Sequence, residues 1–260
     1  MMQKPLILVT NDDGILAPGI RALIEVMSEI GEVVVVAPDS PQSAMGHAIT
    51  INSTLTLNKT SANNATLLEY SCSGTPVDCV KMAVNEVLKR KPDLCVSGIN
   101  HGSNSSINVI YSGTMSAAIE AGIEGINAIG FSLCDYEWNA DFETIKPYVK
   151  QIALEVLKNK LPIGTVLNVN FPKLKFNDLK GIKICRQANA MWQEQFDKRI
   201  SPIGKEYYWL SGKFVNFDKG EDTDEWALAN GYVSIVPTQF DMTAHHSIGV
   251  LNTWNFKLNN

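Results

Sequence analysis

Short runs of purely apolar residues alternate with amphipathic stretches along the first half of the chain. Residues 6–9 and 33–37 are apolar throughout, which is typical of parallel strands covered on both faces. Five apolar positions between these runs recur at helical spacing: Ile20, Leu23, Ile24, Met27 and Ile30. Pro18 near the first turn and Gly31 just past the last turn mark the ends of this helix. A strand, a helix and a strand within about 30 residues predict a right-handed βαβ unit.

The same alternation continues to about residue 180. Thr75 and Pro76 have the residue types of an N-cap and a first helical position, and they predict a helix carrying Val77, Val80, Val84, Val87 and Leu88. Further strands are predicted at 94–96, 126–133 and 165–171, and further helices at 115–122 and 141–158. The pattern predicts an α/β fold with a doubly wound, mostly parallel sheet, and residues 1–180 as its core.

One segment interrupts this core. Residues 48–71 carry apolar side chains at even spacing on either side of a polar cluster at 61–64. Alternation of this kind indicates strands, and the polar cluster indicates a turn between them. We therefore expect a β-ribbon inserted into the α/β core at 48–71.

The pattern changes again beyond residue 180. Aromatic and apolar residues at 207–210 and 214–217 flank Ser211 and Gly212, which predicts a hairpin with its turn at these two residues. A short helix at 222–230 and a last strand at 232–236 are also predicted. We expect residues 181–260 to be a β-rich extension of the same domain, used in contacts between subunits.

Composition and charge exclude several classes of protein. The chain has 260 residues, 22 basic and 27 acidic, so its net charge of −5 argues against binding to a nucleic-acid backbone. No apolar run approaches the roughly 18 residues of a membrane span, and the first residues lack the features of a secretory signal. The five cysteines form no close pair. We expect a cytoplasmic protein that binds neither membranes nor nucleic acid.

The polar residues after the first strand are the strongest chemical signal. Ligands of open α/β sheets bind outside the carboxyl ends of the strands, and Asp12 and Asp13 lie there. Two adjacent carboxylates repel each other unless a divalent cation lies between them, although a solvated Asp-Asp-Gly turn explains the pair equally well. Ser43 and Asn100, after neighbouring strands, add oxygen atoms and favour the metal. Oxygen ligands prefer Mg²⁺, Mn²⁺ or Ca²⁺ to zinc, so we expect one such ion per subunit.

A second group of residues has the character of a phosphate site. Ser112, Gly113 and Thr114 precede a predicted helix, whose N-terminus attracts anions, although an ordinary N-cap fits these residues equally well. Asn104, in a loop of small donors, is a weaker candidate. Neither the P-loop pattern nor the dinucleotide-binding glycine pattern follows a strand, so these two nucleotide-binding classes lack support.

Histidines and aromatic residues add weaker signals. His47 and His101 lie on the strand-end loops, where a histidine is more often solvated or hydrogen-bonded than catalytic. Trp192, Phe196 and the aromatic run at 207–209 have the chemistry to stack on a base, but such residues more often form a core or a subunit contact.

These motifs, in their order and spacing, resemble the SurE survival-protein family. In the first half they are 9–14 (VTNDDG), 36–38 with 43–47 (VAP and SAMGH), 73–80 (SGTPVDCV), 97–100 (SGIN) and 111–114 (YSGT). In the tail they are 201–204, 207–209, 231–237 and 241–243. Any one of these blocks is a weak signal, but their agreement over nearly the whole chain is highly specific.

The resemblance implies a Rossmann-like, SurE-like fold and a metal-dependent 5′-nucleotidase. Such an enzyme hydrolyses nucleoside 5′-monophosphates to nucleoside and phosphate, and often acts on 3′-nucleotides or short polyphosphate. The resemblance also implies that Asp12, Asp13, Ser43 and Asn100 hold the ion. It implies a homodimer or homotetramer in which the C-terminal part is exchanged or packed between subunits. Ser106 and Asn108 depart from the family pattern, which bears on the shape of their loop and on substrate preference.

The resulting hypothesis is hydrolysis of a phosphate monoester, with Asp12 in the catalytic machinery. Asn104, Ser112, Gly113 and Thr114 would hold the phosphate oxygens, and His47 is the candidate proton donor to the leaving alkoxide. Attack by a carboxylate and attack by water are both left open by the residues.

Two alternative functions belong to other classes. A receiver-like phosphoacceptor also places acidic residues after its first strand, but it needs an acceptor Asp and a Lys after later strands. Asp39 follows the second strand, and no such Lys stands out. A non-catalytic nucleotide-binding module would bind nucleotide with metal and release no phosphate.

Overall fold

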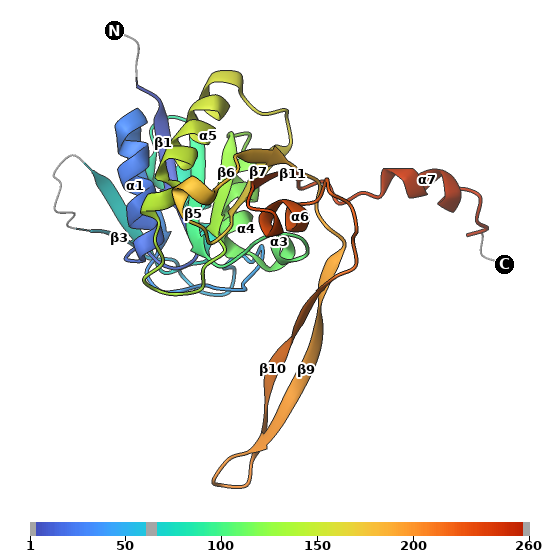
Figure 1. Cartoon of the computed structure of the whole chain (residues 1–260). Helices are drawn as coiled ribbons and strands as arrows, with labels where there is room; N and C mark the ends of the chain where they lie inside the picture. The colour runs from blue at the N-terminus through green and yellow to red at the C-terminus, as the bar shows by residue number, and fades with distance from the viewer. Residues whose placement is uncertain (1–3, 61–66, 257–260) are drawn as a thin grey trace.

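The computed structural model describes residues 4–60 and 67–256, which form a layered α/β body and a projecting arm (Figure 1). Within these residues, nine strands make one sheet in the order β3-β4-β2-β1-β5-β6-β7-β11-β8. Its strands are β1 (Leu6–Thr10), β2 (Glu32–Pro38), β3 (Leu57–Lys59), β4 (Leu68–Cys72), β5 (Leu94–His101), β6 (Ala128–Leu133), β7 (Thr165–Phe171), β8 (Ile182–Ile184) and β11 (Val233–Gln239). Neighbouring strands from β4 to β7 run parallel, whereas β3 and β11 pair antiparallel with β4 and β7.

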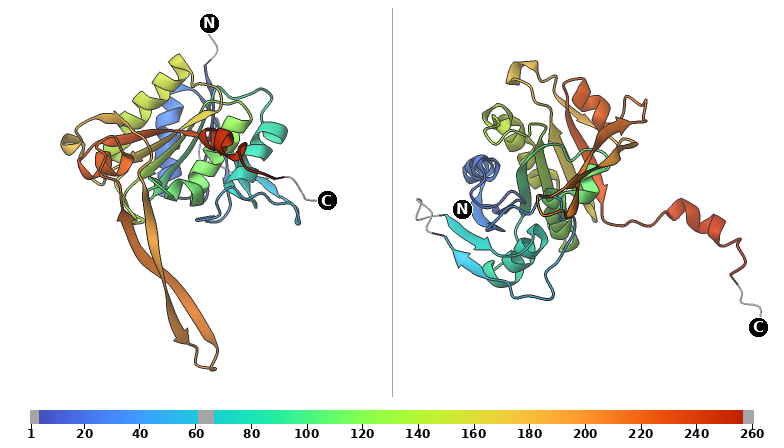
Figure 2. Two further views of the ribbon diagram at one scale, coloured as in Figure 1. Left: turned by 90° about the vertical axis from the view of Figure 1, so that its right-hand side faces the viewer. Right: turned by 90° about the horizontal axis from the view of Figure 1, so that it is seen from below.

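Helices cover both faces of the sheet (Figure 2). They are α1 (Pro18–Ile30), α2 (Pro76–Met82), α3 (Asn108–Tyr111), α4 (Gly113–Ile123), α5 (Lys146–Asn159), α6 (Asp224–Ala229) and α7 (His245–Leu251). A π-helical segment, Ala83–Val87, continues α2, and 3-10 turns precede α5 and β8 at Glu143–Ile145 and Phe176–Asp178. Helices α1 and α5 pack on one face, and α2 and α4 on the other. The predicted doubly wound α/β fold is confirmed.

Strand β1 shows why the central strands are apolar at every position. Ile7 and Val9 belong to the core beneath α1 and α5, whereas Leu6 and Leu8 belong to the core beneath α2 and α4. Successive side chains of a strand point to opposite faces, so a strand covered on both faces must be apolar throughout. For this reason the continuous apolar runs identified the parallel strands correctly.

The start of α2 is fixed by a capping box. The Thr75 hydroxyl accepts a hydrogen bond from the Asp78 N–H, and the Asp78 carboxylate accepts one from the Thr75 N–H. The same carboxylate accepts hydrogen bonds from the backbone and side chain of Thr50. This confirms the predicted helix start and also ties the long connection after β2 to the body of the protein.

The segment predicted as a β-ribbon insertion at 48–71 contains the expected antiparallel strands, but they are not separate from the main sheet. Strands β3 and β4 are antiparallel neighbours, but β4 also pairs in parallel with β2, where Val34 lies opposite Leu68 and Pro38 opposite Cys72. The segment therefore extends the edge of the main sheet. Alternation within the segment indicated strands but carried no information about the distant strand on which they pair. The turn predicted at 61–64 lies outside the described residues.

The turn predicted at Ser211 and Gly212 is wrong. Strands β9 (Ala190–Ile200) and β10 (Glu206–Asn216) pair along their whole length, and the turn lies between them. Gly212 is a mid-strand residue, where an added Cβ would stand 2.6 Å from the Gln193 carbonyl oxygen. Glycine therefore permits a close approach of the two strands. At the actual turn, Gly204 supplies the positive φ of 79°.

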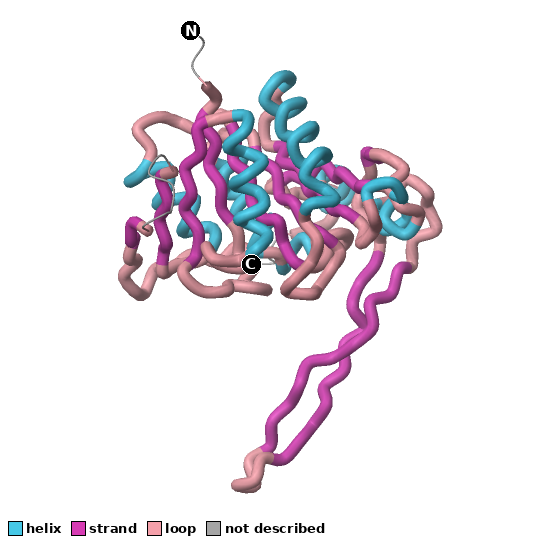
Figure 3. Tube along the Cα trace, turned by 60° about the vertical axis from the view of Figure 1, so that its left-hand side comes forward, coloured by secondary structure: helices cyan, strands magenta, loops and turns pink. Residues whose placement is uncertain are grey.

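The arm formed by β9 and β10 projects far from the body (Figure 3). Most of its residues are exposed, including a group of large apolar side chains: Phe196, Ile200, Tyr208, Trp209 and Leu210. Helix α7 also lies away from the sheet, at the end of the C-terminal tail (Figure 1). Strands β8 and β11, by contrast, lie beyond residue 180 but belong to the main sheet. In residues 4–60 and 67–256, no helix combines the length and apolar character needed to cross a bilayer.

Candidate functional site

The candidate site lies at the carboxyl ends of the central strands. Strand β1 lies between β2 and β5 in the sheet. The chain passes from β1 to β2 on one side of it, and later returns to form β5 on its other side, which makes β1 the point where the strand order reverses. The loops after β1 and β5 diverge at such a switch point, which leaves a crevice for a ligand. The predicted residues Asp12, Ser43, Asn100, Asn104 and Ser112 all line one cavity of about 210 Å³ at this edge.

Asp12 is the one carboxylate among these five residues, and it is buried, with 4% of its surface exposed. The Thr114 hydroxyl donates to its Oδ1 atom at 2.5 Å. Gly113 is needed next to it, because an added Cβ would lie 2.6 Å from the Asp12 Cβ. The first turn of α4 therefore packs directly against Asp12 and sets its orientation.

The electrostatics of the Asp12–Asp13 pair favour a cation. Burial, and then the charge of Asp13, raises the pKa of Asp12 to about 6, although the hydrogen bond from Thr114 acts in the opposite direction. In the described part of the chain, neither aspartate forms an ion pair with a lysine or arginine. Asp13 instead accepts hydrogen bonds from the Nδ1 and backbone N–H of His101, at 3.0 and 3.3 Å. Asp13 is thus paired with His101, whose pKa this hydrogen bond raises, whereas Asp12 has no cationic partner among the described residues.

The Asn100 side chain is fixed with its amide nitrogen turned inward. Nδ2 donates to the carbonyl oxygens of His101 and Gly102, at 3.2 and 3.0 Å, which leaves Oδ1 as the end available to a ligand. An irregularity in the pairing of β5 with β6 between Ser97 and Asn100 produces this placement. Gly98, with φ of 123°, lies within it.

Ser43 reaches the cavity from the loop after β2. The N–H of the preceding residue, Gln42, donates to the Asp12 carbonyl oxygen at 2.7 Å, and the Ile15 N–H donates to the Pro38 carbonyl oxygen at 2.8 Å. These two backbone bonds hold the loops after β1 and β2 together. Ser43 is exposed and lines the cavity.

The donor set fits a hard divalent cation. Asp12, Asp13, Ser43 and Asn100 offer carboxylate, hydroxyl and amide oxygen atoms, which are the ligands of Mg²⁺, Mn²⁺ and Ca²⁺. Across residues 4–60 and 67–256, no three His, Cys, Asp or Glu side chains gather in a metal-binding arrangement.

The residues predicted to hold phosphate occupy two different environments. Ser112 is the N-cap of α4, where its hydroxyl accepts the Met115 N–H, and its side chain lines the cavity. Asn104 also lines the cavity, held by bonds described below. Thr114 is fully buried with its hydroxyl directed at Asp12, and Gly113 packs on the same aspartate.

Three residues that the sequence analysis missed hold Asn104 in place. The Asn104 side chain donates to Ser132, its backbone N–H donates to Asn170, and its carbonyl oxygen accepts from Asn168, each at 2.8 Å. Asn168 and Asn170 also bond to each other. The signal available in the sequence was the presence of two asparagines in the otherwise apolar strand β7, because buried amides need partners.

The structure does not bring His47 to the cavity at Asp12. Its Nε2 lies 2.8 Å from Oε2 of the buried Glu120, whose other oxygen pairs with Lys81. The His47 side chain lines a separate, mostly apolar cavity beside α4. A buried carboxylate is a strong partner for an imidazole, and this pairing draws the side chain away from the strand ends.

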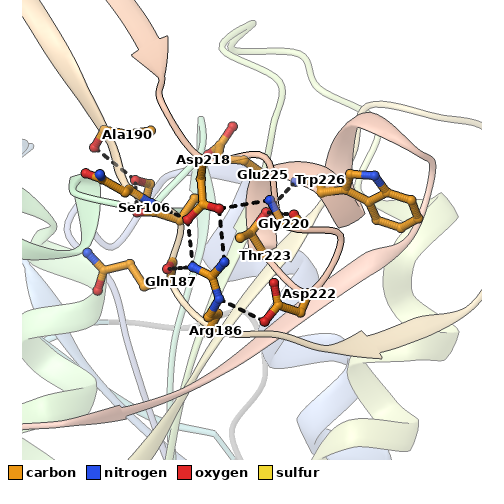
Figure 4. A network of polar contacts seen from close by, with 12 residues as sticks. Ser106, Arg186, Gln187, Ala190, Asp218, Gly220, Asp222, Thr223, Glu225 and Trp226 are labelled. Atoms are coloured by element: carbon orange, nitrogen blue, oxygen red, sulfur yellow. Dashed lines mark hydrogen bonds and ion pairs between the residues drawn. The ribbon is translucent and has the colours of Figure 1, made fainter.

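A polar network joins the base of the arm to the loop after β5 (Figure 4). Arg186 forms two bonds to Asp218, at 2.6 and 2.9 Å, and one to Asp222 at 2.8 Å. These bonds hold the pKa of Asp218 well below its usual range. Ser106, one of the departures from the family pattern, donates its N–H to Asp224 and its hydroxyl to the carbonyls of Ala188 and Ala190.

Comparisons with known proteins agree with this geometry. Residues 7–194 match the family described as Survival protein SurE. A 5′-nucleotidase SurE of Flavobacterium psychrophilum is 80% identical over 98% of this chain and 99% of its own length. One from Bacteroides fragilis is 48% identical over 97% of this chain and 98% of its own. A crystal structure of a Sure protein from Aquifex aeolicus has a TM-score of 0.83 at 39% identity, and covers 95% of this chain and 98% of the other.

Proposed function

The chain belongs to the SurE family, and from that membership we propose that it is a 5′-nucleotidase, which hydrolyses nucleoside 5′-monophosphates to nucleoside and phosphate. The relatives carrying that name match nearly the full length of the chain. The proposal includes 3′-nucleotides and short polyphosphate as further substrates, since they present the same terminal phosphate group.

The buried carboxylate of Asp12, next to Asp13, carries the proposal for the site. Asp12 is almost fully buried beside Asp13, and its pKa is raised to about 6. A divalent cation would offset the cost of keeping the buried Asp12 carboxylate ionised beside Asp13. We therefore place one divalent ion per subunit, Mg²⁺ or Mn²⁺ with Ca²⁺ as an alternative, on Asp12, Asp13, Ser43 and Asn100.

The chain's own residues would position the phosphate monoester beside this ion. When bound, the ion neutralises charge that develops on the phosphoryl oxygens and lowers the pKa of water. Thr114 orients Asp12, and His101 orients Asp13. Ser112 and Asn104 line the cavity, where the N-terminus of α4 attracts the phosphate. Positioning and electrostatic stabilisation supply most of the catalysis in phosphoryl transfer.

The experiment measures phosphate release from nucleoside 5′- and 3′-monophosphates with Mg²⁺, with Mn²⁺ and with EDTA. We expect release that requires metal and that falls by about 10²- to 10³-fold in Asp12→Asn, because the variant loses a carboxylate from the reaction centre. Asp39→Asn is the matched control, because Asp39 is an exposed aspartate after the neighbouring strand β2. Near-normal activity of Asp12→Asn would refute the proposed site.

The same control separates the enzyme from a receiver-like phosphoacceptor. In that alternative, Asp39 follows the second strand in the place of an acceptor. Incubation with acetyl phosphate would then add one phosphoryl group to the intact mass of the wild type and none to Asp39→Asn. For the proposed 5′-nucleotidase we expect no stable adduct in either protein.

The arm supports self-association as part of the proposal. Its apolar side chains, including Phe196, Trp209 and Leu210, are more than half exposed. Exposed apolar area on this scale marks an interaction surface. We propose that it packs against another copy of the chain in a homodimer or homotetramer. The net charge of −5 favours free nucleotides over nucleic acid as substrates, and we propose that the enzyme works in the cytoplasm.

A further inference from the structure

A larger cavity adjoins the one at Asp12. It has a volume of about 480 Å³, within the range of small-molecule sites. Four residues line both cavities, namely Ser103, Asn108, Tyr136 and Trp192. A ligand whose phosphate lies near Asp12 can therefore extend past these residues into the larger cavity without crossing another element.

Trp192 is an exposed aromatic side chain that is nevertheless held in one orientation. Its indole N–H donates to Oδ1 of Asn108 at 2.8 Å, and its ring packs edge-on against Phe214, with ring centroids 5.5 Å apart. The residue still exposes 42% of its surface. A ring fixed in advance loses little conformational entropy when a flat ligand stacks on it.

Tyr136 is a second aromatic residue between the two cavities. Its ring lies over Gly102, where an added Cβ would stand 2.4 Å from the ring. The missing side chain makes room for this contact, and Tyr136 remains 73% exposed. Tyr136 comes from the loop after β6 and Trp192 from the arm, so two independent elements each present an aromatic ring at this place.

Glu225 contributes a carboxylate to the lining of the larger cavity, which is otherwise mostly apolar. Glu225 accepts a hydrogen bond from the Ser105 hydroxyl through Oε1, and no described residue bonds to its Oε2. A partly buried acceptor of this kind pairs with a hydroxyl or amino group of a ligand. Two aromatic rings and a carboxylate acceptor in one cavity match the chemistry of a base and its sugar.

The position of the arm relative to this cavity is fixed by the network at its base. Ser106, in the loop after β5, contacts the backbone at Ala188 and Ala190, two residues before Trp192 (Figure 4). Asp224 receives the backbone N–H groups of both Ser106 and Ala188. Trp192 is therefore held against the loop that carries Asn104 and Asn108.

We propose that the larger cavity holds the nucleoside half of the substrate, with Trp192 and Tyr136 stacking on the base. This inference rests on the proposed 5′-nucleotidase function. Stacking recognises the flat face that all bases share, so it selects nucleotides over other phosphate monoesters with little preference among bases. The specificity of the enzyme for nucleotides then resides in aromatic residues outside the metal site.

The test compares adenosine 5′-monophosphate with ribose 5-phosphate, in which a hydroxyl group replaces the base. Stacking on one aromatic residue contributes about tenfold or more per base. We expect Trp192→Ala and Tyr136→Ala each to lower the ratio of the two kcat/KM values, nucleotide over sugar phosphate, by about tenfold, with kcat/KM for ribose 5-phosphate little changed. Trp254→Ala, an exposed tryptophan in neither cavity, should leave the ratio unchanged.

Several results would overturn the inference. An equal loss on both substrates would place the aromatic residues in general support of the site, and an unchanged ratio would exclude them from base recognition. A changed oligomeric mass in Trp192→Ala with an unchanged ratio would show that a partner subunit fills the cavity. If Trp192→Ala does not fold, Tyr136→Ala and Trp192→Leu decide the question, because Tyr136 lies on the body and leucine keeps an apolar side chain on the arm.

A binding measurement separates this inference from the proposed function. Transfer of saturation from the protein to the base protons of adenosine, observed by NMR, requires no catalysis. Even if the wild type released no phosphate, loss of this transfer in Trp192→Ala would support the nucleoside cavity. Equal transfer in the wild type and Trp192→Ala, or no transfer in either, would refute it.

Discussion

Removal of the Thr114 hydroxyl tests how the structure prepares Asp12. Valine keeps the branched shape of threonine and deletes only the group that donates to Asp12 Oδ1 at 2.5 Å. Both residues are buried, with Thr114 at 0% and Asp12 at 4% exposure, so water does not replace the lost donor. The variant therefore leaves a buried carboxylate short of one hydrogen bond.

The magnitude follows from the charge on the acceptor. A hydrogen bond to a charged group contributes about 1.5–3 kcal/mol, which corresponds to about a 10- to 100-fold change in an equilibrium constant. Loss of a residue that orients a metal ligand costs about 10- to 100-fold in metal affinity or activity. We expect the Mn²⁺ concentration at half-maximal phosphate release to rise by this factor in Thr114→Val. Thr114→Ser, which keeps the hydroxyl, should remain within about threefold of the wild type.

The assay also distinguishes two roles for Thr114. If its hydroxyl binds phosphate, as the sequence analysis expected, Thr114→Val raises KM for the nucleotide and leaves the Mn²⁺ midpoint unchanged. If the hydroxyl orients Asp12, Thr114→Val instead raises the Mn²⁺ concentration at half-maximal phosphate release. A variant with the wild-type circular dichroism spectrum and an unchanged Mn²⁺ midpoint would refute the orienting role.

Two further predictions concern a buried carboxylate and the arm. His47, and then Lys81, lowers the pKa of Glu120 from its usual 4.5, so this stabilisation is present above pH 4.5 and is lost as the pH falls through the lowered value. Urea unfolding should show Glu120→Gln about 1–2 kcal/mol less stable at pH 7, a difference that shrinks at pH 3.5, and a constant difference would contradict this account. Light scattering should show a dimer or tetramer for the wild type and a monomer for Phe196→Lys with Leu210→Glu, which places opposite charges on two paired positions of the arm. A monomeric wild type would contradict the proposal that the arm packs against another copy of the chain.

The general fold was predictable because the sheet is covered on both faces. Strands such as β1 and β2 must then be apolar at every position, and helix α1 must carry apolar residues on one side only. Local chemistry marked the ends, as at Thr75 with Asp78. These features depend on neighbours within one or two turns, so the linear sequence contains them.

Part of the candidate site was predictable for a topological reason. The carboxyl ends of parallel strands meet at one edge, so Asp12, Ser43 and Asn100 come together although they lie far apart in the chain. The sequence therefore determined that these three residues gather at the cavity. It also determined, through the order and spacing of its motifs, the family to which the chain belongs.

The partners of individual side chains were decided only by the tertiary structure. Asp12 accepts a hydrogen bond from the hydroxyl of Thr114, 102 residues away in the sequence. His47 is hydrogen-bonded to Glu120, and Trp192 donates a hydrogen bond to Asn108. The pairing of β4 with β2 and the mid-strand role of Gly212 likewise depend on a distant strand. A polar side chain has many possible bonding partners in the chain, and these differ little in energy. The packing of the whole fold selects one of them, through contacts that no local sequence pattern encodes.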